Sequence, residues 1–185
     1  MTELKYKFSL YFQEPSKQSG KVQKSEKDWM AGFHHIYTCT TLENFWRMCH
    51  NIPRPQKIPA RSSYYMFKEG VKPAWEDKEN VGGGRFQIIQ KQTLINRDHF
   101  EFVFFDLLIL LVCDQLPSTD LITGVQFNNN KQAIEIWVKK GINQELLRKA
   151  IEDDINALLA ARGIDGKLTS QAIPYTSFEK AAERR

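Results

Sequence analysis

The sequence predicts an α+β fold in which an antiparallel sheet packs against three helices. Short segments rich in Val, Ile, Tyr, Phe and Thr, a composition typical of strands, recur along the chain. Three longer segments carry either apolar residues at helical spacing or the residue pattern of a helix start. Strands and helices follow one another in mixed order, which disfavours the regular alternation that builds a parallel sheet.

Length and composition indicate one globular domain over residues 1–185. Of the 185 residues, 42% are hydrophobic and 26% are charged, so the chain can bury a core and is too apolar to be disordered. A net charge of +4 mildly favours anionic partners. The three cysteines are far apart and form no CxxC pair, which argues against disulfides and zinc. With no secretory signal pattern and no membrane-length apolar stretch, we expect a cytoplasmic protein without a membrane partner.

Several short segments are predicted to be strands, and the fifth and sixth of them form a hairpin over Asn128–Lys131. The predicted strands are 6–12, 29–40, 62–68, 85–92, 121–127, 133–139 and 167–173. The segments 13–28 and 178–185 are polar or charged, and we expect both to be mobile.

Three helices are predicted from different signals. Thr40 and Glu43 form a capping box, which predicts a helix over 41–52 that ends at the prolines after it. Residues 98–114 are strongly apolar and favour a helix, with a strand as the alternative because Phe and Val are frequent. Residues 144–162 show the clearest helical periodicity, and Gly163 follows as a stop signal.

The sequence contains no recognisable catalytic constellation. The four histidines are scattered and fall in no metal-binding or nucleophile motif. The run Gly82-Gly83-Gly84-Arg85 lacks the Lys-Ser/Thr of a P-loop and the third glycine of a dinucleotide-binding turn. We therefore expect a protein that is not an enzyme and that uses no metal or cofactor.

Three tryptophans occupy positions from which they can bind a ligand. Alternation along 134–139 puts Ile134, Ile136 and Val138 on one face of a strand and Trp137 on the other. Trp75 lies in a loop directly before two acidic residues, and Trp29 opens a strand after the polar loop. For each ring a purely structural role is the alternative to ligand binding: the ring packs under a loop or anchors one.

The fourth tryptophan suggests a second surface. In the helix predicted over 41–52, Phe45, Cys49 and Ile52 form one apolar stripe, while Leu42 and Trp46 form another about 100° away. One helix hardly buries both stripes under one sheet. Leu42 and Trp46 are therefore candidates for a partner-binding patch.

Aromatic rings together with carboxylates and basic residues suit a flat, phosphorylated ligand. Two rings can hold a base between them, and a positive charge on the base adds a cation–π attraction. A carboxylate beside the rings can accept two hydrogen bonds from a guanine edge, and Lys or Arg can contact phosphates. An N7-methylated guanine nucleotide, the mRNA cap, has all of these properties.

Three motifs resemble the eukaryotic translation initiation factor 4E family. They are Thr41-Leu42-Glu43-Asn44-Phe45-Trp46, the long run from Tyr65 to Asp77 (YMFKEGVKPAWED), and the turn Gly83-Gly84-Arg85-Phe86. The resemblance extends in order from about Phe8 to Phe178. It implies a curved antiparallel sheet with three helices on its convex face and the cap in a slot on its concave face.

The resemblance also implies roles for individual residues. Trp29 and Trp75 would be the two stacking rings, Glu76 would pair with the guanine edge, and Trp137 would lie near the N7-methyl group. On the convex face, three residues match the positions that receive a partner helix with a Tyr-x4-Leu-hydrophobic motif. The partner would be a 4G-type initiation scaffold or a 4E-binding protein, and the three residues are Leu42, Trp46 and Asp106.

The chain departs from the family pattern at several places. Other aromatics replace tryptophans at Phe8, Tyr11, Phe86 and Phe104, and Asn128–Asn130 occupy the hairpin region where the family has a phosphate-binding Arg. Lys131 is then the main candidate for a phosphate contact and Arg85 a second one, so we expect phosphate recognition to be weak.

Two alternatives to cap binding remain open on the sequence alone. In the first alternative, the chain is a generic single-stranded RNA or nucleotide-binding module that has lost cap specificity, and it stacks bases without needing Glu76. In the second alternative, the chain is an adaptor that keeps only the convex surface and represses translation.

Overall fold

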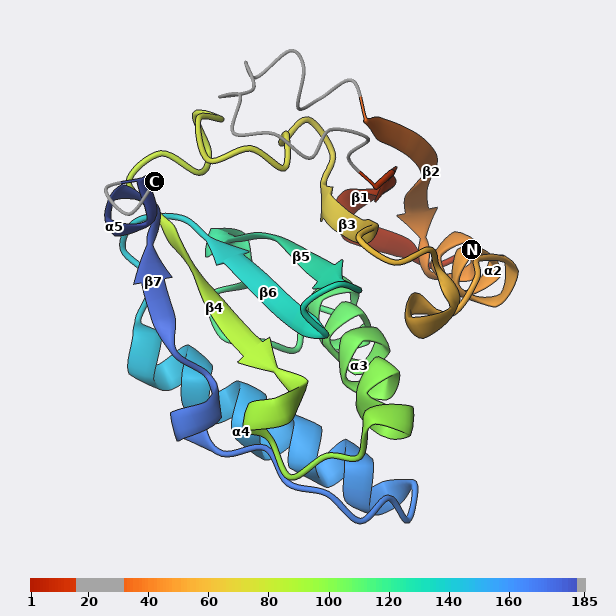
Figure 1. Cartoon of the computed structure of the whole chain (residues 1–185). Helices are drawn as coiled ribbons and strands as arrows, with labels where there is room; N and C mark the ends of the chain where they lie inside the picture. Colours follow the sequence, from red (N-terminus) through yellow and green to blue (C-terminus); the bar gives the residue numbers. More distant parts are fainter. Residues whose placement is uncertain (16–31, 183–185) are drawn as a thin grey trace.

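The computed structural model describes residues 1–15 and 32–182 of the chain, without the side chains of residues 181 and 182. Seven strands form one sheet in the order β2-β1-β3-β5-β6-β4-β7, and every neighbouring pair is antiparallel (Figure 1). The strands are β1 (Glu3–Gln13), β2 (Phe33–Thr41), β3 (Ser63–Lys68), β4 (Gly84–Ile89), β5 (Ile122–Asn128), β6 (Ala133–Val138) and β7 (Tyr175–Ser177).

Three helices share the main hydrophobic core with one face of the sheet, as the α+β prediction requires. They are α2 (Leu42–Asn51), α3 (Phe100–Val112) and α4 (Gln144–Ala161), and α4 crosses behind β4 and β7 in Figure 1. A fourth, short helix, α5 (Phe178–Ala182), follows β7 at the opposite end of the sheet from α2. We call the face of the sheet that carries α2, α3 and α4 the convex face and the other the concave face.

The helix predictions hold with small shifts. The side chain of Thr41, not Thr40, caps α2 by accepting a hydrogen bond from the backbone N–H of Asn44 at 3.2 Å. The cap lies one residue later than expected because β2 extends through Thr41. Residues 100–112 are helical, which excludes the alternative of a strand. In α4 the residues at helical spacing are buried, and they are Leu147, Ile151, Ile155 and Leu159.

The strand predicted over 167–173 is wrong. Side chains of α4 bind the backbone of this segment, so it does not need a neighbouring strand. The Asn156 amide bonds the N–H and the C=O of Leu168, both at 2.8 Å, and Glu152 accepts from the N–H of Ser170 at 3.1 Å. The strand forms later, as β7, and pairs with β4. Residues 178–182, expected to be a mobile end, form α5, because Phe178 is buried.

A second, smaller apolar cluster covers the concave face. The alternation predicted along β6 is confirmed, because Ile134, Ile136 and Val138 belong to the main core while Trp137 lies in the second cluster. Its buried members are Tyr65, Phe67, Val71, Trp137 and Phe178. Gly124 makes room for this cluster, since a Cβ atom there would lie 2.4 Å from the Phe67 ring.

Candidate functional site

The loop 69–83, between β3 and β4, carries the predicted ligand contacts Trp75 and Glu76. Two polar side chains fold this loop on itself. The Asp77 carboxylate accepts from the backbone N–H groups of Lys72 at 3.0 Å and Glu79 at 2.9 Å. The amide nitrogen of Asn80 donates to the carbonyls of Lys72 at 3.1 Å and Ala74 at 2.8 Å. These side chains and the backbone hydrogen bonds of several turns, such as Asp77 N–H to the Ala74 carbonyl at 3.1 Å, hold the loop without regular secondary structure.

This fold of the loop leaves its tip open to solvent. Val71 and Ala74 are buried and anchor the loop, whereas Trp75 is 37% exposed and Glu76 is also exposed. A large ring and an adjacent carboxylate thus stand together on a fixed loop, as the sequence predicted. Trp29, the second predicted ring, lies outside the described residues.

Trp137 lies on the predicted face of β6, but its ring is covered. Only 6% of the residue is exposed, because Phe67 and Phe178 pack against it with ring centroids 5.4 and 4.7 Å away. Its indole N–H has no hydrogen-bond partner within the described part of the chain. Phe178 also ties α5 to the loop, since its backbone N–H donates to the carbonyl of Gly83 at 3.0 Å.

A row of polar side chains crosses the concave face beside Trp137. The buried Glu135 accepts from the Arg85 guanidinium at 3.0 Å and from the Gln87 amide at 2.8 Å. On the neighbouring strand pair, the Tyr65 hydroxyl accepts from Gln126 at 2.9 Å. Burial, and then the charge of Glu135, raise the pKa of Tyr65 far above its usual range, so the phenol stays protonated.

Glu135 was not among the residues predicted for the site. The alternation along the strand could have indicated it, because Glu135 lies between Ile134 and Ile136 and therefore shares the face of Trp137. Arg85, predicted as a phosphate contact, reaches the same face but is bound to this carboxylate. The second predicted phosphate contact, Lys131, is exposed in the β5–β6 turn, where its backbone N–H donates to Asn128 at 3.0 Å.

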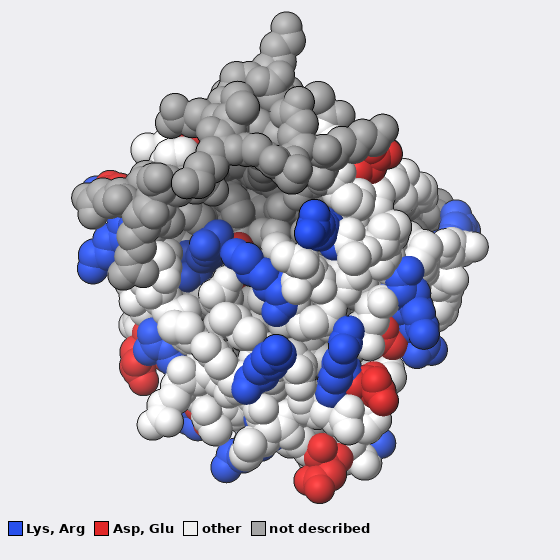
Figure 2. Space-filling model, viewed as in Figure 1, with Lys and Arg blue, Asp and Glu red and all other residues white. Residues whose placement is uncertain are grey.

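Figure 2 shows the molecule from the side of β4 and β6. Lys and Arg side chains gather over the middle of this face, and Asp and Glu side chains lie mostly toward its edges. The side of the molecule seen in Figure 2 therefore favours an anionic ligand, in agreement with the net charge.

On the convex side, Leu42 and Trp46 lie on α2, whereas Asp106, the third predicted partner-binding residue, is buried in α3. Trp46 is 40% exposed and its ring stacks against His50, with centroids 6.1 Å apart. Leu42 is half-buried against the core. Asp106 is fully buried and bound by Arg162 from the end of α4, so its carboxylate does not lie on the surface beside Trp46.

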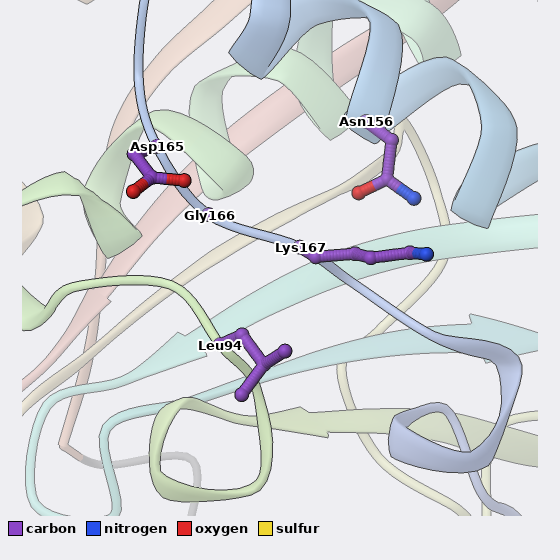
Figure 3. Close-up of a pocket in the computed structure, with 5 residues that line it drawn as sticks. All are labelled: Leu94, Asn156, Asp165, Gly166 and Lys167. Atoms are coloured by element: carbon purple, nitrogen blue, oxygen red, sulfur yellow. The ribbon is translucent and has the colours of Figure 1, made fainter.

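A shallow pocket of about 520 Å3 lies away from both surfaces, between α4 and the loops that follow β4 and α4 (Figure 3). Its lining residues are Leu94, Asn156, Asp165, Gly166 and Lys167. The Asn156 amide is occupied by the backbone of Leu168, and none of the predicted site residues that the structure describes lines this pocket.

The described residues, 1–15 and 32–182, hold neither a metal-binding cluster nor a membrane-length apolar helix. No group of three or more His, Cys, Asp or Glu is placed to hold a metal ion. None of the helices there combines the length and the apolar character needed to cross a membrane.

Known proteins resemble this chain in both sequence and fold. It is 27% identical over 143 residues to eukaryotic translation initiation factor 4E-1 of Prunus domestica, which covers 76% of this chain and 58% of that protein. It is 30% identical over 140 residues to factor 4E-2 of Arabidopsis thaliana, which covers 75% and 54%. The chain thus spans little more than half the length of these two relatives.

Solved structures share the fold over nearly the whole chain. The Ascaris suum eIF4E-3 complex with an m7G cap superposes with a TM-score of 0.70 at 21% identity, covering 96% of this chain and 91% of that one. Schistosome eIF4E, complexed with m7GpppG and 4E-BP, gives a TM-score of 0.69 at 24% identity and covers 84% and 83%. The family model for eukaryotic initiation factor 4E matches residues 3–184. The chain therefore belongs to the eukaryotic initiation factor 4E family.

Proposed function

We propose that this chain binds the N7-methylguanosine cap of mRNA on its concave side and links it to a translation initiation scaffold, without catalysis. The main support for the proposal is the exposure of Trp75 and Glu76 on the loop 69–83. Its internal hydrogen bonds present Trp75 and Glu76 side by side to solvent, next to the aromatic cluster around Trp137. Related proteins with the same fold have been solved with cap nucleotides bound.

In the proposed complex the methylated base stacks on Trp75, with Trp29 as the second ring. The positive charge of the methylated base strengthens its attraction to both rings. Glu76, whose side chain is exposed, accepts two N–H donors from the guanine edge. These roles follow from family membership and from the exposure of the loop tip. They require that Trp75 and Glu76 keep their positions, which the bonds of Asp77 and Asn80 ensure.

The experiment is a tryptophan-fluorescence titration with N7-methyl-GTP and with GTP, on the wild type and on Trp75→Ala and Glu76→Gln. We expect saturable quenching by N7-methyl-GTP and much weaker binding of GTP. Losing a stacking ring should cost about 1–3 kcal/mol, and losing the bidentate acceptor about 1–3 kcal/mol.

Other results would point to the alternatives. Equal affinity for both nucleotides, unaffected by Glu76→Gln, would indicate a generic nucleotide-binding module. If neither nucleotide bound, cap binding would be rejected and only a role in protein interaction would remain.

The convex face is the proposed site of a scaffold or 4E-binding protein. Trp46 is an exposed aromatic on a helix that is otherwise packed on the core, and schistosome eIF4E has been solved with 4E-BP. Large aromatic side chains of this kind dominate the energetics of many interfaces. A partner helix with a Tyr-x4-Leu-hydrophobic motif is the expected ligand of this surface.

A further inference from the structure

The Arg85–Glu135 pair is an ion pair on the concave face. Glu135 is 2% exposed, and its two carboxylate oxygens accept hydrogen bonds from Arg85 and Gln87, respectively. The side chain of Arg85 is 29% exposed, so this arginine is bound to a buried carboxylate and is itself still partly open to solvent. Together the two side chains carry no net charge.

This pair lies next to the proposed cap slot. Arg85 pairs directly with Trp137 across β4 and β6, and Glu135 is two residues from Trp137 on the same face. The loop that carries Trp75 and Glu76 ends at Gly83, two residues before Arg85. A nucleotide whose base stacks on Trp75 therefore has Arg85 as one of the nearest basic side chains on the sheet.

We propose that Glu135 is a specificity-determining residue that limits how strongly the site responds to the number of cap phosphates. It does so by cancelling the charge of Arg85 beneath the phosphates, and the inference rests on the proposed cap-binding function. Two opposite charges 3.0 Å apart act at a distance as a dipole, whose attraction for an anion is much weaker than that of a lone cation.

The test is a charge cycle on four proteins: wild type, Glu135→Gln, Arg85→Gln and the double variant. For each protein, the dissociation constants of N7-methyl-GMP and N7-methyl-GTP are measured at low and high salt. We call the constant for N7-methyl-GMP divided by the constant for N7-methyl-GTP the phosphate ratio, so a higher ratio means a larger gain in affinity from the added phosphates. Glu135→Gln should raise the phosphate ratio roughly three- to tenfold at low salt, because the Arg85 charge is no longer cancelled. High salt should reduce this gain.

The other two variants separate charge cancellation from a direct ligand role. Arg85→Gln leaves a negative charge and should lower the phosphate ratio below that of the wild type. The double variant is neutral at this site, as is the wild type, and should restore the wild-type ratio. If Glu135 instead held Arg85 as an essential phosphate ligand, Glu135→Gln would lower the ratio and the double variant would stay low, which would overturn the proposal.

Glu101→Gln is the matched control. Glu101 is also a buried carboxylate that binds a partly exposed arginine, Arg54 at 2.9 Å, but it lies on α3 at the convex face. The substitution Glu101→Gln changes the net charge by the same amount as Glu135→Gln and should leave the phosphate ratio unchanged. Unfolding curves check that each variant is folded, and Glu135→Ala, which removes the same charge, replaces Glu135→Gln if the latter is unstable.

Binding of the nucleoside N7-methylguanosine separates the two proposals. If the wild type binds the nucleoside but Glu135→Gln and Glu135→Ala do not raise the phosphate ratio, only the role of Glu135 is rejected. If the wild type binds neither the nucleoside nor the nucleotides, the cap-binding function is rejected and the role of Glu135 with it.

Discussion

The guanidinium of Arg162, the residue after α4, contacts both carboxylate oxygens of Asp106 in the middle of α3. Asp106 is fully buried, whereas the Arg162 side chain is 34% exposed and lies over the Phe102 ring. The pair joins two of the three helices on the convex face. It also removes Asp106 from the surface that a partner could contact.

This geometry predicts unequal effects of breaking the pair from its two sides. Arg162→Ala leaves a buried, uncompensated carboxylate and should cost about 3–5 kcal/mol of unfolding free energy. Asp106→Asn leaves an arginine that can reach water and should cost less, about 1–3 kcal/mol. Urea unfolding measures both. Lys149→Ala, which breaks an exposed pair with Asp153 on α4, serves as the control and should change stability little. Equal costs for both variants would contradict the prediction.

Asn80→Asp should weaken N7-methyl-GTP binding although Asn80 is fully buried and does not face the ligand. The new carboxylate would oppose the carbonyl oxygens of Lys72 and Ala74, to which the amide now donates. Leaving these groups unpaired costs about 1–3 kcal/mol and releases the loop tip. Fluorescence titration measures the loss of affinity. Asn51→Asp, which removes a similar amide-to-carbonyl bond at the exposed end of α2, should bind normally. An unchanged affinity of Asn80→Asp would show that the loop does not need this tie.

Trp46→Ala should abolish binding of a Tyr-x4-Leu peptide and leave the affinity for N7-methyl-GTP unchanged. A central aromatic anchor is typically worth about 2 kcal/mol or more, and Trp46 lies on the face opposite the loop 69–83. Calorimetry with the peptide measures the first effect and fluorescence the second. Leu146→Ala is the matched control, because Leu146 is an exposed apolar side chain on α4. Peptide binding that survives Trp46→Ala would place the partner elsewhere.

Lys68 predicts a pH dependence of stability. Burial lowers the pKa of Lys68 to about 8 in the folded protein, where its ammonium group donates to the carbonyl of Thr119 at 2.7 Å and lies 3.8 Å from the centre of the Tyr6 ring. An unfolded lysine titrates near 10.5, so between these values the unfolded chain binds more protons and stability rises with pH.

The comparison is with Lys68→Met, which does not titrate. The stability of the wild type relative to Lys68→Met should be lowest below pH 8 and should rise toward pH 10.5, by at most about 1.4 kcal/mol per pH unit. Urea unfolding at several pH values measures this difference. A difference that stays constant over this range would mean that Lys68 remains charged in the folded protein.

The sequence predicted the elements whose signals are local. The periodicity of α4, the cap and proline stop of α2 and the alternation around Trp137 each depend on residues close together in the chain. The strand expected over 167–173 does not form because Asn156 and Glu152 of the preceding helix α4 bind that backbone, and the residue pattern within the segment does not show these contacts. For Trp137 the face was predicted correctly and packing under another segment was the stated alternative, but the residue that covers the ring, Phe178, was not predicted.

Ion pairs between residues far apart in the chain could not be predicted from the sequence either. Arg85 and Glu135 are 50 residues apart in the chain, and only the β4–β6 register brings them together. Asp106 is a similar case, since the resemblance to the family assigned it to a partner and the structure assigns it to Arg162. Pairing of charges distant in sequence depends on topology, which composition and spacing do not encode.

The contact of Phe178 with Trp137 and Gly83 has a consequence for the order of folding. The β5–β6 hairpin needs only a short turn to close and can form early. The environment of Trp137 also requires a segment 41 residues downstream of it, and long loops close at an entropic cost that slows folding. We therefore expect the concave surface to be completed late during refolding, after the hairpin that forms its floor.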